Sequence, residues 1–140
     1  MNSGKLLFID EDFASIRYYL SELSDEKFDV NHVRTTDGAL AAIKTENDQY
    51  QLIVLDSAMP PGKVYEKLPT DSGTATGGLL FADIRKQSNA PIIILTNFNS
   101  LEWIQKAEAT QNVRVLKKLD TLPRELVACV KEMIKESLRR

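Results

Sequence analysis

The stretch LIVLDSAMP, at residues 52–60, decides the fold class, because four consecutive apolar residues end abruptly at a carboxylate. An apolar run of this length predicts a strand that is buried on both faces. Two further runs of the same kind are LLFI at residues 6–9 and IIIL at residues 92–95. Such strands are typical of a parallel sheet with a layer of helices on each side.

Strand-like and helix-like segments alternate along the whole sequence. Helical spacing of apolar residues predicts helices near residues 13–23, 36–43, 79–84, 101–107 and 123–138, with Thr36 as a cap and Pro123 in a first turn. Residues 28–33 and 113–116 are strand-like. We therefore predict five β-α pairs, an α/β fold, and one domain over residues 1–140 without a linker.

The composition is that of an ordinary globular protein and excludes several classes. Hydrophobic residues make up 43% of the 140 residues, charged residues 27%, and the formal net charge is −2. We therefore expect no nucleic-acid binding driven by a strong positive field. No stretch approaches the roughly 18 apolar residues of a membrane span. With a single cysteine, Cys129, and no secretory pattern, we expect a cytoplasmic location.

Polar side chains follow the predicted strands where ligands bind in open parallel sheets, at the carboxyl ends. Carboxylates follow the first and third strands, a hydroxyl follows the fourth, and lysines follow the fifth. Carboxylates that lie close together repel one another unless a cation neutralises them, and Mg²⁺ prefers oxygen ligands. A carboxylate beside Mg²⁺ can attack a phosphoryl group, whose oxygens a lysine and a hydroxyl can then hold.

The whole chain resembles the receiver domains of two-component response regulators, whose Asp-x-x-Met-Pro motif matches residues 56–60. The resemblance implies a flavodoxin-like three-layer sandwich with five parallel strands in the order 2-1-3-4-5. It also implies the roles of the site residues. The implied site has Asp10, Glu11, Asp56 and the Ala58 carbonyl as Mg²⁺ ligands, with Asp56 as phosphoacceptor and Thr96 and Lys118 as ligands of the phosphoryl oxygens.

The resemblance further implies a function in a phosphorelay. A sensor histidine kinase or phosphotransfer protein would donate the phosphoryl group to Asp56, and a conformational change would signal to a downstream protein target. We expect no direct contact with nucleic acid or membrane, and no enzymatic activity beyond self-phosphorylation. The sequence leaves homodimer formation open.

Several features depart from the family pattern. Val115 stands where the family has a switch aromatic, and Asn97 follows Thr96 where the family usually has a small residue. Leu119 replaces the proline that follows the family's lysine, so we expect a trans peptide bond before it. Residues 61–76 form an insertion beside Asp56, which we hypothesise to be a lid or a partner-specificity element.

Two alternatives remain at the level of sequence. One is a degenerate receiver that binds partners without phosphorylation, which Val115 and Leu119 favour. The other is a haloacid-dehalogenase-like phosphotransferase with Asp10 as nucleophile and Asp12 as general acid/base. That family needs a further acidic pair after the lysine strand, whereas the chain after Lys118 is expected to form a single amphipathic helix. Otherwise we expect Asp12 to be mainly a helix cap and His32 to be structural or exposed.

Overall fold

The computed structural model describes residues 3–46, 49–68, 75–97 and 101–139. Strands and helices alternate along these residues, as the sequence predicts. Their order is β1 (Gly4–Ile9), α1 (Phe13–Asp25), β2 (Phe28–Val33), α2 (Thr36–Glu46), β3 (Leu52–Leu55), α3 (Thr76–Gln87), β4 (Ile92–Thr96), α4 (Glu102–Glu108), β5 (Val113–Lys117), the 3-10 helix η2 (Lys118–Asp120) and α5 (Pro123–Leu138). Among the described residues, no helix is both long and apolar enough to cross a membrane.

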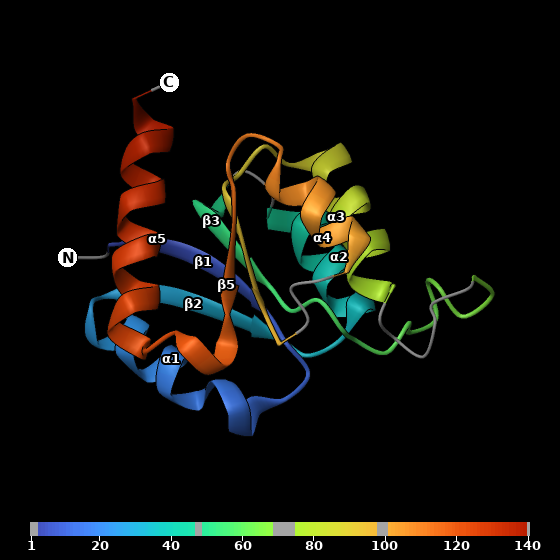
Figure 1. Ribbon diagram of the computed structural model, residues 1–140, viewed down its shortest axis with the longest axis horizontal. Helices are drawn as coiled ribbons and strands as arrows, with labels where there is room; N and C mark the ends of the chain where they lie inside the picture. The colour runs from blue at the N-terminus through green and yellow to red at the C-terminus, as the bar shows by residue number, and fades with distance from the viewer. Residues whose placement is uncertain (1–2, 47–48, 69–74, 98–100, 140) are drawn as a thin grey trace.

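The strands form one parallel sheet in the order β2-β1-β3-β4-β5. Helices α1 and α5 cover one face of the sheet, and α2, α3 and α4 cover the other (Figure 1). All residues of β3 and β4 are buried, because these strands have sheet neighbours on both sides and helices above and below. The predicted flavodoxin-like fold and its strand order are therefore confirmed.

Apolar side chains divide into two clusters according to the alternation of side chains along a strand. In β1, Leu7 and Ile9 point to the cluster beneath α2 and α3, whereas Leu6 and Phe8 point to the cluster beneath α1 and α5. Cys129 belongs to the second cluster. Both faces of the sheet are thus packed, and the central strands β3 and β4 are accessible only at their ends.

The start of α2 differs from the prediction by one residue. The Thr35 hydroxyl accepts a hydrogen bond from the Gly38 N–H at 2.9 Å, so Thr35 caps the helix. Thr36 is fully buried, and its hydroxyl donates to the Pro61 carbonyl at 3.0 Å. The prediction that Thr36 is the cap is wrong, because a tertiary contact with the insertion uses its hydroxyl.

Helix α3 begins against the loop that follows β3. A Cβ on Gly77 would lie 2.2 Å from the backbone oxygen of Ser57. Only a residue without a side chain permits this approach. The close contact places the first turn of α3 beside the residue that follows Asp56.

Candidate functional site

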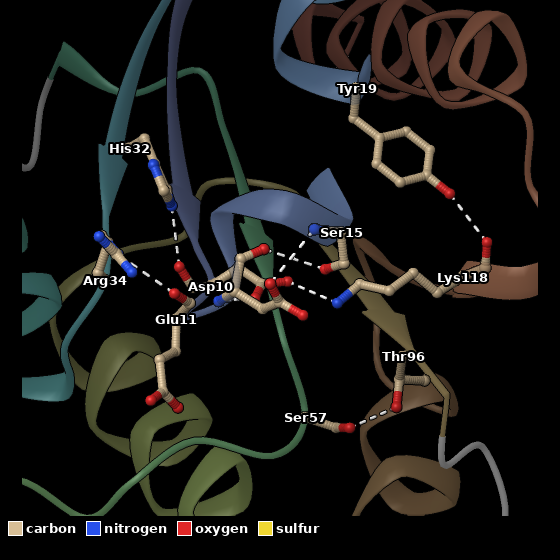
Figure 2. A network of polar contacts seen from close by, with 10 residues as sticks. Asp10, Glu11, Ser15, Tyr19, His32, Arg34, Ser57, Thr96 and Lys118 are labelled. Atoms are coloured by element: carbon tan, nitrogen blue, oxygen red, sulfur yellow. Dashed lines mark hydrogen bonds and ion pairs between the residues drawn. The ribbon is translucent and has the colours of Figure 1, made fainter. Parts of the chain in front are cut away.

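The predicted site residues lie together at the carboxyl edge of the sheet. Asp10 follows β1, Asp56 follows β3, Thr96 ends β4 and Lys118 follows β5. Figure 2 shows the side chains of Lys118 and Asp10 directed toward one another. The parallel sheet therefore brings together residues that are up to 108 positions apart in the sequence.

A buried ion pair joins two of these residues. The Lys118 Nζ atom lies 2.7 Å from Asp10 Oδ2, and the two side chains are only 10% and 1% exposed. The other carboxylate oxygen of Asp10 accepts the Asp12 N–H at 2.9 Å. The side chain of Lys117 is 51% exposed and lies 3.9 Å from Asp120. Lys118, and not Lys117, is thus the lysine whose side chain is paired with Asp10.

The carboxyl group of Asp56 is held in an unfavourable environment for its charge. Burial, and secondly the negative charge of Asp10, raise the pKa of Asp56 to about 6. The charge of Lys118 and the backbone N–H groups of Ala58 and Ser57 oppose this rise. Two carboxylates thus share one lysine, so an additional positive charge at this edge would stabilise the ionised form of Asp56.

Neighbouring side chains fix the backbone of the acidic corner, residues 10–12. The ring Nε2 of His32 lies 2.8 Å from the Asp10 carbonyl, and Arg34 Nε donates to the Glu11 carbonyl at 3.2 Å. Asp12 caps α1 by accepting the Ser15 N–H, as predicted. Sequence reasoning missed the contact of His32 with this corner, because the register that pairs Phe8 with His32 is a property of the sheet.

The predicted Mg²⁺ ligands are only partly assembled. Glu11 is exposed, and Figure 2 shows its carboxylate directed away from the Asp10–Lys118 pair. Within the described part of the chain, no three acidic, histidine or cysteine side chains form a metal-binding group. Asp10 and Asp56 nevertheless supply carboxylate oxygens whose two charges are opposed by the single charge of Lys118, which suits a hard divalent cation. The Mg²⁺ site remains a prediction that requires Glu11 to change its rotamer.

Thr96 has a neighbour that sequence reasoning missed. Ser57 and Thr96 are both 0% exposed. Their hydroxyl groups are hydrogen-bonded to each other, as Figure 2 shows. The register of β3 and β4 pairs Leu55 with Ile94, so two residues further along Ser57 lies opposite Thr96. The Ser57–Thr96 contact follows from the register of β3 and β4, which cannot be derived from the sequence pattern.

A tyrosine of α1 is hydrogen-bonded to the backbone of the loop that carries Lys118. The Tyr19 hydroxyl lies 2.9 Å from the Lys118 carbonyl and 2.6 Å from the Thr121 carbonyl. No cis peptide bond occurs among the described residues, so the Lys118–Leu119 bond is trans, as expected. The side chain of Leu119 is 88% exposed.

The described half of the insertion is packed against the α2–α3 layer, and we call Pro61–Leu68 the docked segment. The Lys63 and Val64 N–H groups each donate to the Asp37 carboxylate at 3.1 Å. Tyr65 is buried, and its hydroxyl donates to Asp83 at 2.5 Å. Burial and the carboxylate of Asp83 raise the pKa of Tyr65. Residues 69–74 lie outside the described residues, so the lid or partner-specificity hypothesis remains a hypothesis.

Comparison with known proteins gives one curated relative. The chain is 32% identical over 93 residues to the transcriptional regulatory protein CpxR homolog of Haemophilus influenzae, a match that covers 66% of this chain and 34% of that protein. The match therefore spans about a third of the relative's length. No family model matches the sequence.

Solved structures agree with the fold over nearly the whole chain. The Francisella response regulator 1452 receiver domain is 25% identical with a TM-score of 0.71, and the match covers 96% of this chain and 99% of that one. A CheY-like response regulator receiver domain protein from Methanospirillum hungatei JF-1 is 22% identical with a TM-score of 0.73, and covers 97% of each chain. The fold of the chain and the arrangement of its site residues are those of the response-regulator receiver domains to which it is similar.

Proposed function

We propose that the protein is a phospho-receiver of a two-component or phosphorelay pathway, in which Asp56 accepts a phosphoryl group. The observation that carries the proposal is the environment of Asp56. Its carboxylate shares the buried Lys118 with Asp10, and its pKa is raised to about 6. A cation bound at this edge of the sheet would offset the repulsion between the Asp56 and Asp10 carboxylates. A covalent bond formed by the Asp56 carboxylate would remove the charge on that oxygen.

The phosphoryl transfer needs a nucleophile, a donor and charge stabilisation. An Asp56 carboxylate oxygen attacks the phosphorus of a phosphohistidine on a sensor kinase or phosphotransfer protein. The P–N bond breaks, its electron pair returns to the imidazole, and an acyl phosphate forms on Asp56. A bound Mg²⁺, held by Asp10, Glu11, Asp56 and the Ala58 carbonyl, supplies charge neutralisation between the two negatively charged partners.

Two residues of this chain hold the transferred group. The ammonium of Lys118, which is paired with Asp10 in this structure, donates to a phosphoryl oxygen once that oxygen carries charge. The Thr96 hydroxyl donates to another. The phosphorylated aspartate adds negative charge at the edge of the sheet and changes the contacts of the loop after β4, which a protein partner then reads.

The test is phosphorylation by acetyl phosphate with and without Mg²⁺, followed by intact mass. We expect a gain of one phosphoryl group that requires Mg²⁺ and is lost in Asp56→Asn. Loss in Asp10→Asn with retention in Asp56→Asn would favour the dehalogenase-like nucleophile instead. That alternative is disfavoured because the Asp12 carboxylate caps α1.

A purified histidine kinase or phosphotransfer protein is the second donor in the test, since some receivers accept phosphoryl groups only from a protein. No gain of mass with either kind of donor would contradict the proposal. The phosphorylation-independent interaction module would then be the better description of this receiver.

A further inference from the structure

The Ser57–Thr96 contact joins the residue after the proposed phosphoacceptor to a proposed phosphoryl ligand. Both side chains are fully buried, and each hydroxyl lies within hydrogen-bond distance of the other. The Ser57 hydroxyl has no other partner among the described residues. The contact is therefore the one that satisfies this buried hydroxyl.

The direction of the Thr96 side chain matters for the chemistry. Figure 2 shows its hydroxyl turned toward Ser57, on the side away from the Lys118–Asp10 pair. A hydroxyl that binds a phosphoryl oxygen between Asp56 and Lys118 must turn toward that pair. Threonine is β-branched, so this change is a rotation about χ1 to another staggered rotamer.

We propose that Ser57 is a positioning residue that restrains Thr96 in the unphosphorylated receiver. The effect of this restraint on phosphoryl binding at Asp56 rests on the proposed function. Rotation of Thr96 leaves the Ser57 hydroxyl buried without a partner, which opposes the active rotamer. Removing the Ser57 hydroxyl removes both this penalty on the active rotamer and the hydrogen bond that favours the resting rotamer.

The first experiment measures the restraint without phosphorylation. The χ1 population of Thr96 is obtained from side-chain coupling constants by NMR in wild type and in Ser57→Ala. We expect one dominant rotamer in wild type and an averaged population in the variant. An unchanged dominant rotamer in Ser57→Ala would overturn the proposal. This result does not depend on whether Asp56 is phosphorylated, so failure of the proposed function is distinguishable from failure of the restraint.

The second experiment measures the consequence for phosphoryl transfer, with acetyl phosphate as donor at saturating Mg²⁺. We expect the initial rate in Ser57→Ala to rise about fivefold, the factor that one hydrogen bond of typical net strength contributes to an equilibrium. A lowered rate would overturn the restraint, because it would mean that Ser57 supports Thr96 in the active rotamer. An unchanged rate would also contradict it.

Matched variants separate this role from a general effect on folding. Ser88 is also buried, at 8% exposure, and its hydroxyl accepts the Ala90 N–H near the opposite end of the sheet. We expect Ser88→Ala to leave the phosphorylation rate unchanged. In a Thr96→Val background, Ser57→Ala should give no rise, since the partner of the restraint is absent. If Ser57→Ala fails to fold, Ser57→Cys keeps the volume with a weaker hydrogen bond, and a smaller rise is expected.

Discussion

Two loops leave the carboxyl edge of the sheet, and they are held in different ways. The acidic corner, residues 10–12, is held by a buried ion pair to Lys118 and by contacts of His32 in β2 and Arg34 after it with its carbonyl groups. The docked segment is held by Asp37 of α2 and Asp83 of α3. The contacts of the acidic corner include a charged pair inside the site, whereas those of the docked segment attach the insertion to two helices.

The difference explains how an insertion is compatible with an ordered site. The Asp56 N–H donates to the Ile9 carbonyl at 2.9 Å, so the residue is tied to β1 before the insertion begins. Buried Tyr65 then anchors the insertion nine residues later against α3. Extra length in a surface loop costs little once its ends are fixed. We therefore expect substitutions in the two loops to have different consequences.

The largest effect is expected from breaking the ion pair of the acidic corner. Lys118→Met leaves the Asp10 carboxylate buried without its cation, so we expect a loss of about 3 kcal/mol in the free energy of unfolding at neutral pH without Mg²⁺. Urea unfolding measures it. Lys117→Met, which changes an exposed pair at 3.9 Å, is the control and should cost less than about 0.5 kcal/mol. Similar losses in both variants would mean that the corner is not held by Lys118.

A pH-dependent effect on stability is expected at Asp56, which is close in space to the acidic corner and precedes the docked segment in the chain. Its pKa in the folded protein is about 6, against an ordinary value of 3.8. Between these values the folded state binds more protons than the unfolded state, so stability falls as the pH rises toward 6 and stays low above it. Asp56→Asn removes this disadvantage, and we expect it to be more stable than wild type by about 2 kcal/mol at pH 7 in EDTA.

Urea unfolding at pH 4.5 and pH 7 measures this effect. Wild type should lose stability between the two values, whereas Asp56→Asn should lose less. An equal loss in the variant would assign the pH dependence to other groups. Addition of Mg²⁺ should stabilise wild type more than Asp56→Asn, because the cation neutralises the carboxylate that the variant lacks.

A smaller effect is expected in the docked segment. Tyr65→Phe removes the hydroxyl that donates to Asp83, so we expect a loss of about 1.5 kcal/mol in unfolding free energy and faster hydrogen exchange over residues 62–67. Tyr18→Phe, at a 63% exposed side chain, is the matched control. Phosphorylation by acetyl phosphate should be unchanged in both variants. A reduced rate in Tyr65→Phe alone would show that the insertion acts on the site.

The smallest effect is expected where α1 holds the loop after β5. Tyr19→Phe removes the hydroxyl between the Lys118 and Thr121 carbonyls, and we expect a loss of about 1 kcal/mol with faster hydrogen exchange over residues 118–122. Tyr50→Phe removes the acceptor of the Asn31 side-chain amide at an equally buried tyrosine and is the control. Tyr50→Phe should leave hydrogen exchange at residues 118–122 unchanged. Faster exchange there in Tyr50→Phe would mean that the effect of Tyr19→Phe does not come from its contact with this loop.

Most of the site could be predicted from the sequence, because apolar runs that end in polar residues mark the carboxyl edge of a parallel sheet. That reasoning placed Asp10, Asp56, Thr96 and Lys118 at one edge, where the structure has them. It did not find Ser57, His32 or Tyr19, because their partners are set by strand register and helix packing. It also assigned the α2 cap to Thr36 instead of Thr35.

The sequence by itself determined the order of the strands and helices, the buried core and the identity of the charged residues at the strand ends. These follow from the period of apolar residues along the chain, which is a local property. Only the tertiary structure decided which side chains meet: Lys118 with Asp10, Ser57 with Thr96, and Tyr65 with Asp83. Contacts between distant residues depend on how the layers pack, and the burial that raises the pKa of Asp56 exists only after they have packed.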